Sequence, residues 1–114
     1  MIKDCKISIL GTKYNIRIVP ASELPDKAGD TDFYTKNILL SDLSDINLEE
    51  STKDIEGFKK HSLRHEILHA FMFESGLDMQ SNEGVPWALN EEMIDWYAIQ
   101  SPKIYKVFEE LDIL

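Results

Sequence analysis

The stretch from about residue 55 to residue 75 constrains the fold most, because its helical pattern is apolar on nearly all sides. Between Leu63 and Phe73, seven of eleven residues are apolar, and they surround the helix instead of forming one stripe. Such a helix must be covered by other elements on several sides. Gly76 is typical of the residue that follows a helix. We therefore predict a central helix in the core of one domain that spans residues 1–114.

The segments on either side of this helix predict strands first and helices after. "CKISILGTKYNIRIV" alternates apolar and polar residues around Gly11 and predicts a hairpin, and "FYTKNILLSD" predicts a third strand that ends near Ser41. A second helix is expected from about Pro86 to Gln100, and Pro102 is expected to open a short C-terminal helix. Loops are expected at residues 26–32 and 77–86, and a loop or short helix at 42–54. The predicted fold class is α+β, with a small antiparallel sheet of about three strands packed on the helices.

Composition excludes several classes of partner and compartment. The formal net charge of −9 argues against nucleic acid, since phosphate binding depends on clustered Lys and Arg. No apolar run approaches the ~20 residues that span a bilayer, and the first ten residues do not resemble a signal peptide. The single cysteine, Cys5, cannot form an internal disulfide and is interpreted as a small strand residue. We expect a cytoplasmic protein without membrane or nucleic-acid partners.

Two histidines in "RHEILHAF" have the spacing of metal ligands. Residues four apart on a helix lie about 40° apart around it and about 6 Å apart along it, so His65 and His69 can both reach one ion. Glu66 lies about 100° from His65, where it could overhang the ion and act as the base for a bound water. The alternative is two core or surface histidines and a solvated glutamate. His61 is too far from His69 to share the same ion, and we interpret it as a surface histidine.

The next helix offers a third ligand. Glu91 and Asp95 are also four apart, on the face that carries the apolar Ala88, Ile94 and Ala98. Carboxylates on an inner face need a cation or a hydrogen-bond donor. A metal ion for Glu91 and the ring N–H of a ligand histidine for Asp95 would satisfy both. Alternatively, the two carboxylates cap the helix or pair with Lys and Arg. Glu92 is the reserve candidate for the third ligand.

The pattern "HEILH", followed by "NEEMID", resembles the gluzincin zinc metallopeptidases, in which HExxH precedes a Glu within NExxxD. The chain also resembles the minimal gluzincins and the small ImmA/IrrE-like peptidases of phages and mobile elements. This resemblance implies a Zn²⁺ cofactor held by His65, His69 and Glu91, with Glu66 as general base and Asp95 supporting a ligand histidine. The metzincin pattern requires Gly at position 72 and His at position 75, where this chain has Met and Ser.

The resemblance also implies a peptide or protein substrate, bound along an edge strand. The candidate strand is "KNILL", namely Lys36, Asn37, Ile38, Leu39 and Leu40. No oxyanion stabiliser is assigned by motif. Three tyrosines could serve, although packing roles are the commoner alternative: Tyr34, Tyr97 and Tyr105. The expected function is zinc-dependent peptide hydrolysis, and the alternative is a metal-stabilised interaction or regulatory module without turnover.

Overall fold

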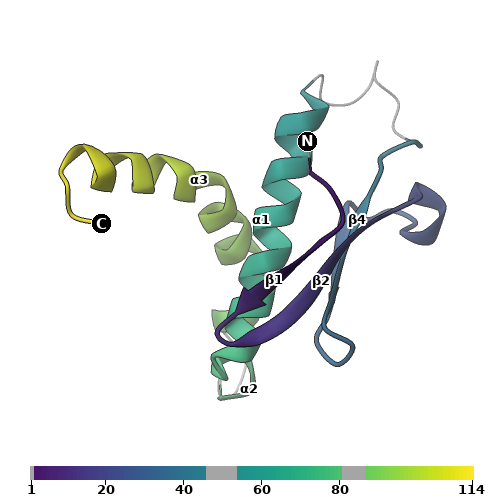
Figure 1. Cartoon of the computed structure of the whole chain (residues 1–114), viewed down its shortest axis with the longest axis horizontal. Helices are drawn as coiled ribbons and strands as arrows, with labels where there is room; N and C mark the ends of the chain where they lie inside the picture. Colours follow the sequence, from purple (N-terminus) through teal and green to yellow (C-terminus); the bar gives the residue numbers. More distant parts are fainter. Residues whose placement is uncertain (1, 46–53, 81–86) are drawn as a thin grey trace.

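The computed structural model of this chain describes residues 2–45, 54–80 and 87–114. It confirms the α+β class, with a sheet in the first part of the chain and helices after it (Figure 1). The elements are β1 (Cys5–Ile9), β2 (Thr12–Val19), η1 (Ala21–Glu23), β3 (Gly29–Asp32), β4 (Asn37–Ser41), α1 (Ile55–Glu74), α2 (Leu77–Gln80), η2 (Trp87–Leu89) and α3 (Glu91–Glu110). None of the described helices is long and apolar enough to cross a membrane.

The sheet has four strands in the order β1-β2-β4-β3. The hairpin of β1 and β2 turns at Leu10 and Gly11, whose φ angles of 49° and 88° fit the two-residue turns that suit twisted strands. β4 pairs in parallel with β2 and antiparallel with β3, so the sheet is mixed and not purely antiparallel as expected. The prediction of a loop at residues 26–32 is wrong for 29–32, which form β3. The sequence "GDTD" lacks an apolar alternation, and only its pairing with β4 makes it a strand.

The core lies between the sheet and α1, which crosses the sheet in Figure 1. Alternate residues of the central strands point to the helix because side chains on a strand alternate between its two faces. Tyr14, Ile16 and Ile38 are buried there against Ala70 of α1. Ile9 is buried in the same cluster, and further apolar side chains pack around it: Ile7, Leu63 and Ile67. The central position predicted for this helix is therefore correct.

A polar cluster ties the end of α1 to the sheet. Glu74 accepts hydrogen bonds from the Tyr14 hydroxyl at 2.7 Å, the Lys36 ammonium at 2.7 Å and the Thr12 hydroxyl at 3.1 Å. Lys36 also lies over the Phe73 ring, with its Nζ atom 4.8 Å from the ring centroid. These contacts join the last turn of α1 to β2 and to the turn before β4.

Both long helices begin at side-chain caps. Asp54 accepts from the backbone N–H of Gly57, and Asn90 accepts from that of Met93 at 2.7 Å. Beyond Glu74, Gly76 has a φ of 82°, the left-handed conformation in which glycine ends a helix. The expected start of the glutamate helix near residue 86 is wrong, since α3 begins at Glu91, one residue after its cap. Residues 77–80 form the short helix α2 and not a loop, whereas 81–86 and most of the 42–54 segment lie outside the described residues.

α3 packs against α1 with its first half and projects away from it with its second half (Figure 1). The packed face contains Ile94 and Ala98, both fully buried. The C-terminal helix expected from Pro102 is present as the continuation of α3, with Pro102 inside one helix instead of at its start. The second half exposes large apolar side chains, among them Tyr105 and Val107, and Leu111 just after the helix is also exposed.

Candidate metal centre

Helix α1 supplies two histidine rings to one point. His65 and His69 lie on successive turns, and their Nε2 atoms are 3.1 Å apart. The spacing of four residues produces this convergence, because both rings leave the same face of the helix. Both side chains are largely buried between α1 and its neighbours.

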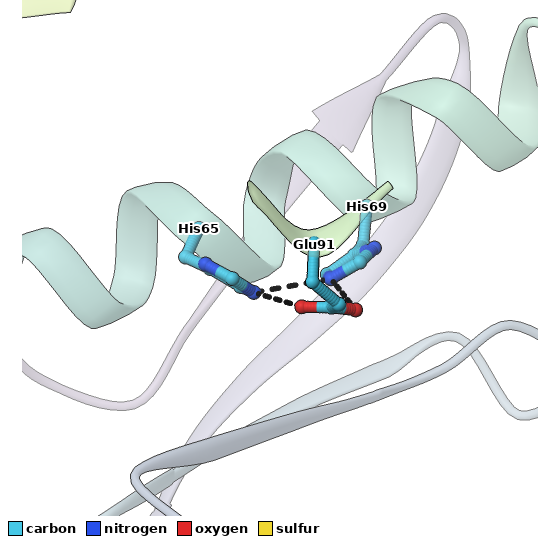
Figure 2. Close-up of side chains that lie close together, drawn as sticks. All are labelled: His65, His69 and Glu91. Atoms are coloured by element: carbon cyan, nitrogen blue, oxygen red, sulfur yellow. Dashed lines mark hydrogen bonds and ion pairs between the residues drawn. The ribbon is translucent and has the colours of Figure 1, made fainter. Parts of the chain in front are cut away.

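Glu91, the first residue of α3, brings its carboxylate to the same point (Figure 2). Its Oε2 atom is 3.0 Å from His65 Nε2, and its Oε1 atom is 3.0 Å from His69 Nε2. One ligand atom from each of the three residues lies within 4.8 Å of the others, so the three could hold a metal ion. The structure thus brings together the three residues that the sequence predicts as ligands.

Asp95, one turn further along α3, contacts the other side of the His65 ring. Its Oδ1 atom is 3.0 Å from His65 Nδ1. Burial acts to raise the pKa of Asp95, but hydrogen bonds from His61 and His65 outweigh burial and lower it. Asp95 is therefore a carboxylate that accepts the Nδ1 proton of His65, which leaves His65 Nε2 free to bind a metal.

His61 is part of this cluster, and its interpretation as a surface histidine is wrong. Its Nε2 atom is 2.7 Å from Asp95 Oδ1, and its side chain is only 25% exposed. The sequence spacing could have indicated this contact. His61 precedes His65 by one turn of α1, and Asp95 follows Glu91 by one turn of α3. Two helices that meet at His65 and Glu91 would also bring the next turns together.

Glu66 follows His65 on α1 and lies where the helix meets the edge of the sheet, in the same cleft as the two rings. It is 9% exposed, and its Oε1 atom accepts a hydrogen bond from the Thr31 hydroxyl at 2.8 Å. Burial raises the pKa of Glu66, although the bond from Thr31 and the nearby His69 and His65 act in the opposite direction. A carboxylate with a raised pKa accepts and releases a proton more readily near neutral pH, as a general base must. Sequence reasoning missed Thr31, because its strand was predicted to be a loop.

Gly29 of β3 allows the strand to approach Glu66. A Cβ atom at this position would lie 2.9 Å from the Cγ atom of Glu66 and 3.1 Å from the carbonyl oxygen of Leu39. A methyl group would fit only if Glu66 shifted and the Leu39 carbonyl gave way by a few tenths of an ångström. Glycine lets the edge strand pass close to the carboxylate without these shifts.

The site opens into a cleft of about 660 Å³ between β3, α1 and the start of α3. Its walls combine the metal-centre residues with apolar side chains, chiefly Phe33, Phe58 and Leu89. Residues Gly29–Thr31 of β3 line the same cleft from the edge of the sheet.

The prediction that "KNILL" forms an edge strand is wrong. Asn37, Ile38, Leu39 and Leu40 belong to β4, an inner strand whose main chain pairs with β2 on one side and β3 on the other. An inner strand has no free edge for a peptide. Lys36 lies in the turn before β4, and its ammonium is bound to Glu74. Within the described part of the sheet, β3 is the edge beside the site.

The three candidate tyrosines lie outside the lining of the cleft as the described residues form it. Tyr34 is exposed and meets the Phe73 ring edge-on, at a centroid distance of 6.4 Å. The hydroxyls of Tyr97 and Tyr105 are 3.1 Å apart on α3 and bond to each other. The structure places none of them at the metal centre.

Comparison with known proteins assigns this chain to no family. No protein-family model, curated protein or solved structure matches this chain.

Proposed function

We propose that this protein is a zinc-dependent peptidase in which His65, His69 and Glu91 bind the ion and Glu66 is the general base. The observation that carries the proposal is the convergence of two imidazoles and a carboxylate from α1 and α3 on one point. Four ligands about 2.0–2.1 Å from a tetrahedral zinc ion lie about 3.3 Å from one another. The two histidine Nε2 atoms are 3.1 Å apart, close to that separation, and each lies 3.0 Å from one of the two oxygens of the Glu91 carboxylate.

The chemistry of the donor set also fits zinc. Two neutral imidazoles and one carboxylate form the ligand set of several catalytic zinc sites, in which a fourth position remains for the reactants. Structural zinc sites usually have four protein ligands with several thiolates, and the single cysteine of this chain, Cys5, lies on β1. Zinc in this setting supplies a Lewis acid, which polarises a carbonyl group and makes a water molecule more acidic.

Glu66 and Asp95 have separate parts in the proposed reaction. Glu66 takes a proton from the attacking water and delivers it to the leaving amine, as its buried position and raised pKa favour. Asp95 holds the proton of His65 on Nδ1 and makes that ring a stronger ligand. Both residues lie on the two helices that carry the ligands, so no other element has to move to bring them to the site.

The edge strand β3 is the proposed place for the substrate. An extended peptide could add to the free edge of Gly29–Asp32 by main-chain hydrogen bonds. This position puts the peptide in the cleft beside Glu66, because Gly29 and Thr31 both contact that side chain. The proposal keeps the binding mode implied by the gluzincin resemblance and assigns it to β3 instead of β4.

Metal content and turnover test the proposal together. Protein purified without chelator is expected to contain one zinc per chain by elemental analysis, with the metal lost in His65→Ala, His69→Ala and Glu91→Ala. Glu92→Ala is the matched control for Glu91→Ala, since Glu92 is the adjacent exposed carboxylate on α3. Hydrolysis of a mixed peptide library, followed by mass spectrometry, should disappear in Glu66→Gln although zinc is retained. Full zinc content in Glu91→Ala would overturn the ligand assignment.

The exposed apolar surface of α3 favours a second candidate, a metal-stabilised interaction module. Trp96, Ile99 and Val107 are at least two-fifths exposed on this helix, and large exposed apolar side chains often mark interaction sites. This candidate shares the zinc centre with the peptidase and differs from it in turnover. Zinc binding with no peptide cleavage by the wild type would favour it.

A further inference from the structure

Where α1 and α3 meet, three imidazoles of α1 alternate with two carboxylates of α3 in one row of contacts. On α1, His61, His65 and His69 follow one another at intervals of four residues; on α3, Glu91 and Asp95 have the same interval. Glu91 joins His69 to His65, and Asp95 joins His65 to His61. The proposed zinc ligands are three of these five groups, His65, His69 and Glu91. His61 occupies the far end and has no part in the function proposed above.

We propose that His61 is a positioning residue for the zinc site, which holds the Asp95 carboxylate where it can orient His65. The inference rests on the proposed function and deepens it, because it assigns to the metal centre a residue beyond its ligands and base. His61 touches neither the ligand atoms nor Glu66 in any described contact, and it acts through Asp95.

Asp95 needs such a partner because it is partly open to water. Its side chain is 43% exposed, so water competes with His65 for the carboxylate oxygens. A single hydrogen bond would also leave the carboxylate group free to rotate about its side-chain bonds. A second donor to the same oxygen, at 2.7 Å, restricts that rotation and is the shorter of the two contacts.

His61 is itself held in place. It leaves α1 one turn before His65, so the helix fixes the separation between the two rings. The Phe58 ring packs edge-on against the His61 ring, with centroids 6.2 Å apart and an interplanar angle of 89°. A proton on Nε2 of His61 and one on Nδ1 of His65 can then both be donated to Asp95 Oδ1. Together these contacts keep His65 in the tautomer that binds metal through Nε2.

Zinc affinity, measured by competition with a chromophoric chelator, tests this role without depending on turnover. The bond from His61 reaches the zinc site only through Asp95, so its loss should weaken zinc binding less than loss of Asp95 itself, by about two- to tenfold. His61→Ala should lower zinc affinity by about that factor, and His61→Gln should restore part of it, since the Gln side chain keeps an N–H donor at similar reach. Ser62→Ala is the matched control: Ser62 also lines the cleft on α1, but its hydroxyl bonds to its own helix.

A double-mutant cycle separates positioning from general destabilisation. If His61 acts through Asp95, His61→Ala should have no further effect on zinc affinity in an Asp95→Ala background. Circular dichroism and thermal unfolding of the metal-free variants establish that each is folded. Equal zinc affinity in the wild type, Ser62→Ala and His61→Ala would overturn the role of His61 and leave the proposed zinc site intact. An undiminished effect of His61→Ala in the Asp95→Ala background would also overturn it. A wild type that binds no zinc would overturn the proposed function together with this inference.

Discussion

The Nε atom of Arg64 on α1 lies 2.6 Å from the backbone oxygen of Ala98 on α3 and donates a hydrogen bond to it. In an uninterrupted helix, the carbonyl of Ala98 would accept from the N–H of residue 102, but that residue is proline and has no N–H. Ala98 is fully buried, so water cannot replace the lost donor. Arg64 supplies it from the neighbouring helix, which lets α3 continue through Pro102.

Arg64→Ala should therefore destabilise the protein by about 1–3 kcal/mol, because it leaves a buried carbonyl without a donor. Urea unfolding followed by circular dichroism measures the loss. Lys60→Ala is the control, since Lys60 is an exposed cation on the same helix. The cost should shrink in a Pro102→Ala background, where residue 102 regains an N–H for Ala98. An equal cost in both backgrounds would show that Arg64 stabilises the fold in another way.

The Glu74 cluster predicts a pH-dependent contribution to stability. The Lys36 ammonium and the Tyr14 hydroxyl lower the pKa of Glu74 through their hydrogen bonds. Burial and the hydrogen bond to Glu74 raise the pKa of Tyr14, so its hydroxyl keeps its proton and remains a donor. A folded-state pKa below the unfolded value, about 4.3, stabilises the protein above that value. The contribution is lost as the pH falls through the folded pKa.

Glu74→Gln should accordingly be less stable than the wild type at pH 7, and the difference should narrow as the pH falls below about 4. Unfolding of the metal-free proteins by urea across this range gives the comparison, with the exposed Glu109→Gln as control. A difference that stays constant down to pH 3 would contradict the assignment.

Gly29→Ala should destabilise the protein by about 1–3 kcal/mol, as expected for a methyl group forced into filled space. The new Cβ atom would meet Glu66 Cγ and the Leu39 carbonyl. A Glu66→Ala background removes Cγ and should lower the stability cost of Gly29→Ala, and the remaining cost should come from the Leu39 contact. Thermal unfolding of the metal-free wild type, the two single variants and the double variant measures the cost of Gly29→Ala in each background. Equal costs in the two backgrounds would mean that the strand, and not Glu66, absorbs the methyl group.

Thr31→Val should lower kcat for peptide hydrolysis about ten- to a hundredfold, the range caused by small misplacements of a catalytic group. Valine keeps the shape of threonine but removes the hydroxyl that donates to Glu66 Oε1. Zinc content should not change, since Thr31 contacts the proposed base and not the ligands. Thr31→Ser keeps the donor and should recover most of the activity. Equal loss in the Ser and Val variants would indicate that packing of the strand matters more than the hydroxyl.

Asp95→Asn should weaken zinc binding about 10–100-fold, the usual effect of removing a carboxylate that supports a ligand histidine. The neutral amide oxygen is a weaker acceptor than the ionised carboxylate oxygen that both rings contact, so it holds the Nδ1 proton of His65 less firmly. Chelator competition measures the loss, and Gln100→Ala provides a control further along α3. Wild-type zinc affinity in Asp95→Asn would limit the metal centre to the three ligands.

The sequence by itself determined the parts of the site that lie within one helix. A spacing of four residues places His65 with His69 and Glu91 with Asp95, because the helical repeat fixes these relationships locally. Caps are equally local, and Gly76 marked the end of α1 correctly. The apolar pattern around His65 also required a covered helix, which the sheet and α3 provide.

Only the tertiary structure decided which elements meet. A strand such as β3, with the sequence "GDTD", has no apolar alternation to reveal it and exists through its pairing with β4. That pairing turned the expected substrate strand into an inner strand and brought Thr31 to Glu66. The contacts of His61 with Asp95 and of Arg64 with Ala98 each join positions 34 residues apart. Contacts of this kind depend on how two helices dock, and no periodicity within either helix specifies that docking.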